Sequence, residues 1–235
     1  MFINRWSGTL LGCLLSQLCL ADTLQIDPRA ESLYQQAVPY LKQAQDKLDV
    51  IPATPPTASA EVRARAEALS IEAGAFLKPA IKLLDQAVAL DHPVAQYRLG
   101  LIYAIIYPLD AVQANACPLF ERSVAQGFAP AALLIPSYCW AFSDTPQFQA
   151  ALQGMQASMP FYEKYFPQPA VKLECRQEQP VGLTMQWGTS REYQAEIFLI
   201  QGDINRPLRT AFYQKAVEIN DCYKAKKRLG IFRQP

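Results

Sequence analysis

A 36-residue repeat is the sequence feature that most restricts how this chain can fold. The repeated positions lie 36 residues apart: Ala80 and Ala116, Ala87 and Ser123, Asp91 and Gly127, Ala95 and Ala131, and Leu99 and Ile135. A constant period of this length is typical of helical solenoids, in which each unit packs on its neighbours in the chain. Apolar residues recur within the units at three- and four-residue spacing, as on one face of a helix. The sequence therefore predicts a mainly α protein, an α-solenoid of antiparallel helix pairs.

Small and turn-forming residues predict where the paired helices reverse and touch. Asp91 and Gly127 fall where a helix ends and the chain turns back, a place that favours the left-handed backbone conformation. Ala95 and Gly100 allow a facing helix to approach closely. His92 is the single histidine of the chain, and its place beside Asp91 predicts a turn residue rather than a catalytic one.

Residues 95–103 (AQYRLGLIY), followed by the pattern AxxLFERSVAQG over 116–127, resemble a Sel1-like repeat, a relative of the tetratricopeptide repeat. The resemblance covers 95–131 well, 77–94 and 131–159 in part, and 211–230 faintly. Two features depart from the family pattern: the loop at 105–110 is not rich in glycine, and Pro136 stands where Gly100 would recur. The resemblance implies a protein-interaction module whose first helix in each pair lines a concave surface.

Helical geometry then assigns residues to that concave groove. Leu99, Gly100 and Tyr103 match the packing positions of the repeat, so other residues of the same helix face the groove. The expected groove residues are Tyr97, Leu101 and Ile105, and in the next repeat Leu133, Ser137 and Trp140. An exposed apolar and aromatic surface of this kind usually binds a partner protein or peptide. The alternative is that the N-terminal helix or a later hairpin covers it.

Four cysteines beyond the N-terminal segment predict two disulfides. Cys117 lies eleven residues before Phe128, the centre of a predicted turn, and Cys139 lies eleven residues after it. Residues equally far from a turn lie at the same height on two antiparallel helices, so we predict a Cys117–Cys139 bond. The pair Cys175–Cys222 follows by elimination. Because no two of these cysteines form a CxxC motif, zinc binding and redox chemistry are weak alternatives.

The N-terminal segment predicts export. Residues 1–21 resemble a signal peptide, with Arg5, a mostly apolar stretch and Ala21 before the expected new N-terminus at Asp22. A rival hypothesis is a lipid anchor at Cys13, because the residues before it resemble a lipobox. We favour a periplasmic or secreted protein without an anchor, since the apolar stretch before Cys13 is very short. No apolar run in the body of the chain is long enough to span a membrane.

Four regions follow along the chain. They are a signal peptide (1–21), an N-terminal helix with a Pro-rich linker (22–58), Sel1-like helical repeats (59–170), and a β-hairpin with a C-terminal helix pair (171–235). Helices are expected at 28–48, 59–76, 78–90, 190–202 and 206–220. Residues 171–187 alternate between apolar and polar on both sides of a short polar loop, which predicts the β-hairpin, with an irregular loop as the alternative.

Composition and motifs restrict the function. The chain has 22 basic and 21 acidic residues, and this balance argues against nucleic acid or an anionic membrane as the main partner. No motif for a nucleophilic serine, a phosphate-binding loop or a metal site occurs, so we predict no enzyme, no cofactor and no metal. Glu192, Glu196 and Asp203 could form an acid pair, but their spacing is also typical of a solvated helix face. We predict an adaptor or scaffold that binds a protein or peptide; the alternative is an envelope enzyme or enzyme inhibitor with a hidden site.

Overall fold

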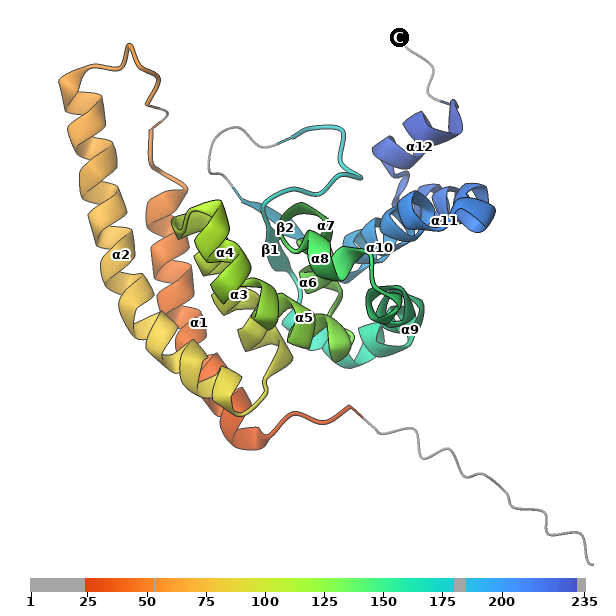
Figure 1. Ribbon diagram of the computed structural model, residues 1–235. Coiled ribbons are helices and arrows are strands. Elements are labelled where there is room, and N and C mark those ends of the chain that lie inside the picture. Colours follow the sequence, from red (N-terminus) through yellow and green to blue (C-terminus); the bar gives the residue numbers. More distant parts are fainter. Residues whose placement is uncertain (1–23, 53, 180–184, 232–235) are drawn as a thin grey trace, which may run out of the picture.

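A computed structural model describes residues 24–52, 54–179 and 185–231, and within these ranges the chain is mainly helical, as predicted (Figure 1). The first half contains α1 (Pro28–Leu48), α2 (Ala60–Ala89), α3 (Pro93–Ile106), α4 (Leu109–Asn115), α5 (Cys117–Ala125), α6 (Ala129–Ala132), α7 (Ile135–Tyr138) and α8 (Trp140–Ser143). The second half contains α9 (Pro146–Tyr162), η1 (Glu163–Tyr165), β1 (Gln168–Ala170), β2 (Gln186–Gly188), α10 (Ser190–Ile204), η2 (Arg206–Leu208), α11 (Arg209–Asn220) and α12 (Tyr223–Leu229). The predicted signal peptide and Cys13 lie outside the described residues.

The long antiparallel pair α1 and α2 forms one end of the molecule, and α10 to α12 form the other (Figure 1). Buried alanines recur every seven residues in both members of the pair, at 30, 37 and 44 in α1 and at 66, 73, 80 and 87 in α2. A seven-residue stripe of small side chains lets two helices approach closely along their whole length. The stripe runs past Pro79, so one helix replaces the two expected at 59–76 and 78–90.

The predicted turn positions are confirmed. Asp91 has a φ of 62° and Gly127 a φ of 79°, so both adopt the left-handed conformation. The residue after each turn closes the same bond to the preceding helix: the amide of His92 donates to the carbonyl of Ala87 and the amide of Phe128 to that of Ser123, each at 3.1 Å. Both repeats therefore end their helices in the same helix-terminating motif.

The unit after Gly127 departs from a regular pair of helices. Its first half is divided into the four-residue helices α6, α7 and α8, and only α9 is long. Pro130 and Pro136 open α6 and α7. A proline has no backbone N–H to donate, which costs nothing in the first turn of a helix, so each of these two prolines favours the start of a new helix at its position.

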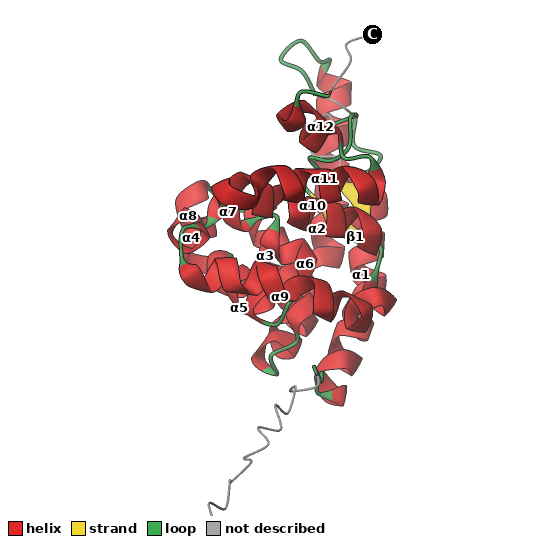
Figure 2. Ribbon diagram, turned by 90° about the vertical axis from the view of Figure 1, so that its right-hand side faces the viewer, coloured by secondary structure: helices red, strands yellow, loops and turns green. Residues whose placement is uncertain are grey.

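The predicted β-hairpin has shorter strands in different places. Strands β1 and β2 are antiparallel, with Gln168 opposite Gly188, and form the one sheet seen among the described residues (Figure 2). Residues 171–176, expected to form the first strand, are irregular. A side chain bonds their backbone in place of a strand partner: the amide of Leu173 donates to Gln186 Oε1 at 2.5 Å. Val181 and Leu183 of the expected second strand lie outside the described residues.

The structure contains both predicted disulfides. Cys117 and Cys139 have Cα atoms 5.5 Å apart, and Cys175 and Cys222 have Cα atoms 4.2 Å apart. The first joins the start of α5 to the residue between α7 and α8, so the helices that it links are shorter than the prediction assumed. Two disulfides are typical of proteins that fold in an oxidising compartment.

Hydrophobic residues gather in two clusters. The larger runs from Tyr34 in α1 through the repeat to Ile197 in α10. The smaller surrounds the Cys175–Cys222 bond and includes Tyr213 and Ala225. Within the described ranges, no helix has the length and apolar character needed to cross a bilayer.

Candidate functional site

The prediction that Tyr97 and Leu101 line an open concave groove is wrong. Tyr97 and Leu101 are only 1% and 3% exposed. The segment leading into the sheet covers this face of α3, and the Tyr97 hydroxyl donates a hydrogen bond to the carbonyl of Pro169. The two residues therefore belong to the core, and the covering alternative holds for this face.

The other predicted groove residues do not gather on one surface with Tyr97. Ile105 is 40% and Trp140 52% exposed. Leu133, half-buried, and Ser137, exposed, line a pocket together with residues of α10. None of the six residues lines a second hollow, to which α3 contributes Arg98 and α1 contributes much of the lining.

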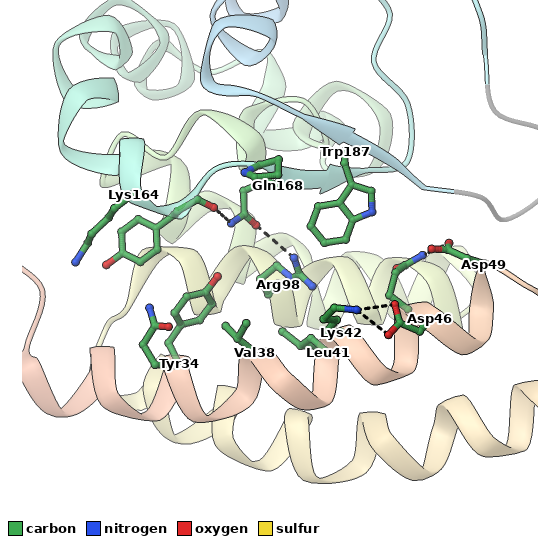
Figure 3. A pocket seen from close by; sticks show the side chains of 14 residues that line it. Tyr34, Val38, Leu41, Lys42, Asp46, Asp49, Arg98, Lys164, Gln168 and Trp187 are labelled. Carbon is green, nitrogen blue, oxygen red and sulfur yellow. Dashed lines mark hydrogen bonds and ion pairs between the residues drawn. The ribbon is translucent and has the colours of Figure 1, made fainter.

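That hollow is a groove of about 450 Å³ between α1 and the segment that runs through η1 and β1, with β2 at its edge (Figure 3). We call it the α1 groove. It is lined by Tyr34, Gln35, Val38, Leu41, Lys42, Gln45, Asp46, Asp49, Arg98, Lys164, Tyr165, Pro167, Gln168 and Trp187. Two of its apolar side chains are exposed, Val38 at 37% and Trp187 at 38%. The groove thus combines the exposed Val38 and the buried Leu41, which we call the apolar strip of α1, with a tryptophan from the sheet.

Arg98 of α3 forms the middle of the groove floor. Its guanidinium carbon lies 5.6 Å from the centre of the Trp187 ring, and one guanidinium nitrogen lies 3.5 Å from Gln168 Oε1 (Figure 3). Gln168 is itself held in place, because it is 1% exposed and its amide donates to the carbonyl of Tyr165 at 2.5 Å. Burial raises the pKa of Tyr34, and the positive charge of Arg98 partly opposes that shift.

A polar cluster, buried at His92 and Tyr165 and partly exposed at Glu31 and Lys164, lies at the end of the α1 groove. Glu31 accepts a hydrogen bond from the Tyr165 hydroxyl, lies 3.4 Å from His92 Nε2 and pairs with Lys164 at 3.5 Å. Burial alone would raise the pKa of Glu31, but the hydrogen bonds from Tyr165 and Gln35 and the charge of Lys164 hold it below its ordinary value. The cluster anchors the first turns of α1 to the rest of the protein.

His92 is a turn residue, as predicted, and it is also fully buried. Its Nδ1 accepts the amide of Ala95 at 3.2 Å and so caps α3, while its ring stacks on Tyr34 at 4.9 Å. Burial lowers the pKa of His92, although the charge of Glu31 opposes the shift. A neutral imidazole suits this role because Nδ1 must accept a hydrogen bond.

The three acids singled out in the sequence have separate structural partners. Glu192 caps α10 through Thr189 and pairs with Arg176 at 2.7 Å, and Asp203 accepts the Tyr213 hydroxyl at 2.6 Å. Glu196 is 2% exposed, and its Oε1 accepts the amide of Cys175 at 2.6 Å. Burial raises the pKa of Glu196 to about 8, with the Cys175 amide opposing the shift. Glu196 and Asp203 line the same pocket, but each of the three carboxylates is already bonded to a different group of the protein.

Sequence reasoning missed the α1 groove because its two walls come from distant parts of the chain. One signal was present: Val38, Lys42 and Asp46 recur every four residues and mark a second face of the first helix, next to the buried one. The pairing of that face with Trp187 depends on the tertiary fold.

Comparisons with protein-family models, with curated proteins and with solved structures gave no match. Among the described residues, no group of three or more His, Cys, Asp or Glu side chains could hold a metal ion. The functional argument therefore depends on the geometry of this chain alone.

Proposed function

We propose that this protein is a periplasmic or secreted protein-interaction module that binds an extended segment of a partner in the α1 groove. The observation that carries the proposal is the exposed Trp187 facing the apolar strip of α1 across the groove floor (Figure 3). Half-exposed aromatic residues at the edge of a groove are typical anchors of protein interfaces. The 36-residue repeat and its resemblance to Sel1-like proteins support the same class of function.

The shape of the α1 groove favours a peptide over a small ligand. The lining residues along α1 run from Tyr34 to the C-cap residue Asp49, which is about 22 Å along a helix axis. An extended chain covers this length in about seven residues. A volume of about 450 Å³ spread over that length fits a narrow strand of peptide better than a compact molecule.

An enzyme would instead need titratable groups that converge at an accessible surface. Glu196 comes nearest, because it lines a pocket of about 300 Å³ with Ser137 and Lys224. Its carboxyl is bonded to the Cys175 amide, and the other two acids of the pocket are bonded as well, Glu174 to Lys224 and Asp203 to Tyr213. We therefore favour binding over catalysis.

The test is a crosslinking experiment in cells that make the protein. A photo-reactive residue replaces Val38 in the groove or, as a control, Ile71, which is 67% exposed on α2 outside it. We expect a partner segment to attach at position 38 only, and Trp187→Ala to weaken its binding by about 1–3 kcal/mol. Trp140→Ala is the matched tryptophan control and should leave binding unchanged.

Equal crosslinking at both positions, or binding that Trp187→Ala does not affect, would contradict the α1 groove as the binding site. A loss of binding in Trp140→Ala alone would instead support the surface around Ile105, Ser137 and Trp140 that the sequence predicted.

A further inference from the structure

Arg98 is the cation of the α1 groove whose charge is left unmatched. It is half-buried, and within residues 24–52, 54–179 and 185–231 it forms no ion pair. Its contacts are the face of Trp187 and the distant Gln168 oxygen at 3.5 Å, which is at the limit of a hydrogen bond. A guanidinium has several N–H donors in a fork that matches a carboxylate, so most of its bonding capacity is unused.

The charged side chains are distributed unevenly along the α1 groove. The other cations have acidic partners: Lys42 pairs with Asp46 at 2.8 Å, and Lys164 with Glu31 at 3.5 Å. In Figure 3, Lys164 lies at one end of the groove, Arg98 lies in the middle, and Asp46 and Asp49 lie at the other end. A ligand that fits these charges has a negative group over Arg98 and no dense negative charge near the two aspartates.

We infer that the α1 groove selects an extended peptide segment of a partner protein that places an acidic side chain on Arg98 and an apolar side chain against Trp187 and Val38. This inference rests on the proposed function and specifies the chemistry of its ligand. A nucleic acid or another polyanion fits less well, because Asp46 and Asp49 would repel it and the chain as a whole carries a net charge of only +1.

The same geometry predicts a spacing within the peptide. Arg98 lies beside Leu41 in Figure 3, and Asp49 is eight residues further along α1, which corresponds to about 12 Å. An extended peptide covers this distance in about four residues. A basic side chain about four residues from the acidic one would therefore reach Asp49.

The experiment selects peptides from a random-sequence library on the full chain and on its variants. The wild-type protein should enrich peptides with an aspartate or glutamate next to an apolar residue. Arg98→Glu should reverse the preference to lysine or arginine. Lys82→Glu, the same charge change on an exposed residue of α2 outside the groove, should select the same peptides as the wild type.

Affinities of a selected peptide make the test quantitative. Replacing its acidic residue by the matching amide should weaken binding to the wild type about tenfold to a hundredfold, the range for a charge-assisted hydrogen bond. The same replacement should have no effect on Arg98→Met, which keeps the apolar stem of the side chain. Far-ultraviolet circular dichroism checks that each variant folds.

The outcomes separate the two proposals. Peptides that depend on Trp187 but show no acidic preference would overturn the role of Arg98 and leave the proposed function intact. If the wild type and Trp187→Ala enrich the same peptides, or neither enriches any, both proposals are contradicted: peptide binding in the α1 groove and the preference for an acidic side chain at Arg98.

Discussion

Gly100 sets the distance between α3 and α5. A Cβ atom at this position would lie 2.6 Å from the ring of Phe120, a residue with no exposed surface. Real Cβ atoms do not approach other atoms so closely, and the buried ring has no free space to move into. The repeat pattern predicted the small residue, and the structure shows the aromatic ring that requires it.

We therefore expect Gly100→Ala to lower the free energy of unfolding by about 1–3 kcal/mol, the usual cost of overpacking a core. Gly154→Ala is the control, because Gly154 is exposed in α9 and a Cβ there meets no atom within 4 Å. It should raise stability by up to about 1 kcal/mol through the better helix propensity of alanine. Denaturant unfolding measures both; a neutral Gly100→Ala would show that the two helices can separate freely.

Glu196 makes stability depend on pH through a single buried carboxyl. Its pKa is raised by burial to about 8 in the folded chain, above the ordinary value of 4.5. The folded protein then holds a proton that the unfolded chain has released between these two values. The stability that this group contributes is present below pH 4.5 and is lost as the pH rises through 8.

Glu196→Gln should flatten this part of the stability profile. A glutamine keeps an acceptor for the Cys175 amide but does not titrate. Between pH 5 and 8, we expect the wild type to lose about 1 kcal/mol per pH unit relative to the variant. Urea unfolding at several pH values gives the difference, with Glu67→Gln on the exposed side of α2 as the control. Parallel profiles for the wild type and Glu196→Gln would contradict the buried acid.

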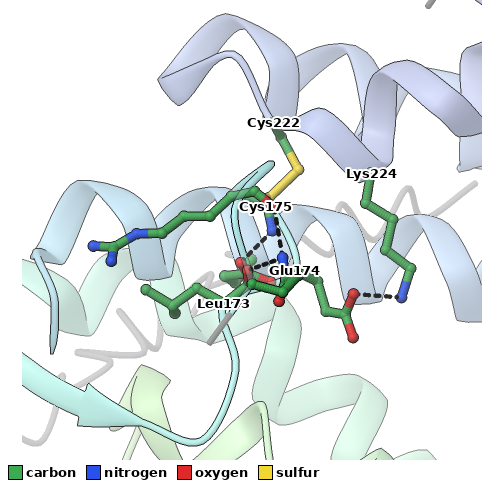
Figure 4. Close-up of a disulfide and its surroundings, with 8 residues drawn as sticks. Leu173, Glu174, Cys175, Cys222 and Lys224 are labelled. Carbon is green, nitrogen blue, oxygen red and sulfur yellow. Dashed lines mark hydrogen bonds and ion pairs between the residues drawn. A yellow bond between two sulfur atoms is a disulfide. The ribbon is translucent and has the colours of Figure 1, made fainter. Parts of the chain in front are cut away.

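At the scale of elements, α12 is attached to the irregular segment 171–179 as well as to α10 and α11, on which it packs. The Cys175–Cys222 bond joins α12 to that segment, the amide of Tyr223 donates to the Cys175 carbonyl at 2.9 Å, and Lys224 pairs with Glu174 at 3.2 Å (Figure 4). A seven-residue helix is too short to be stable alone in water. Its order therefore depends on these links and on the small cluster beneath it.

Replacing Cys175 and Cys222 together by serine should release α12 without unfolding the larger core. The bond spans 47 residues, and closing a loop of this length is worth about 4 kcal/mol in the chain-entropy model. Amide hydrogen exchange should quicken in 171–179 and α12 and stay slow in α2 and α3. The matched change at Cys117 and Cys139 should instead affect α4 to α8; unchanged exchange in α12 after the first change would contradict the attachment.

At the scale of the whole molecule, the sequence predicted correctly those features that depend on interactions between residues close together in the chain. The bounds of α1 and the left-handed residues Asp91 and Gly127 follow from periodicity and turn chemistry. The first disulfide follows from equal distances to a turn, and the second from elimination among the remaining cysteines. The candidate site did not follow, because the contact that buries Tyr97 joins it to Pro169, 72 residues away. Such a contact leaves no periodic trace in either segment.

His92 joins three parts of the fold that are distant in the sequence. It caps α3, stacks on Tyr34 of α1 and packs edge-on against Tyr165 of η1, with ring centres 5.8 Å apart. Because burial lowers its pKa below 6.5, the unfolded chain binds a proton more readily than the folded one. The stability contributed by neutral His92 is therefore present above pH 6.5 and is lost as the pH falls.

This dependence has the opposite sign to that of Glu196, so the two effects on stability partly cancel below pH 6.5. The effect of His92 is best measured in Glu196→Gln, where we expect stability to fall by up to about 1.4 kcal/mol per pH unit below pH 6.5. Adding His92→Asn should remove that slope, because asparagine can cap α3 without titrating. The double variant will be less stable at every pH, since it loses the stacking on Tyr34, but only its slope tests the prediction. If the free energy of unfolding of the double variant still falls below pH 6.5, another group must bind the proton. His92 is then not the residue that makes the contact between α1, α3 and η1 sensitive to acid.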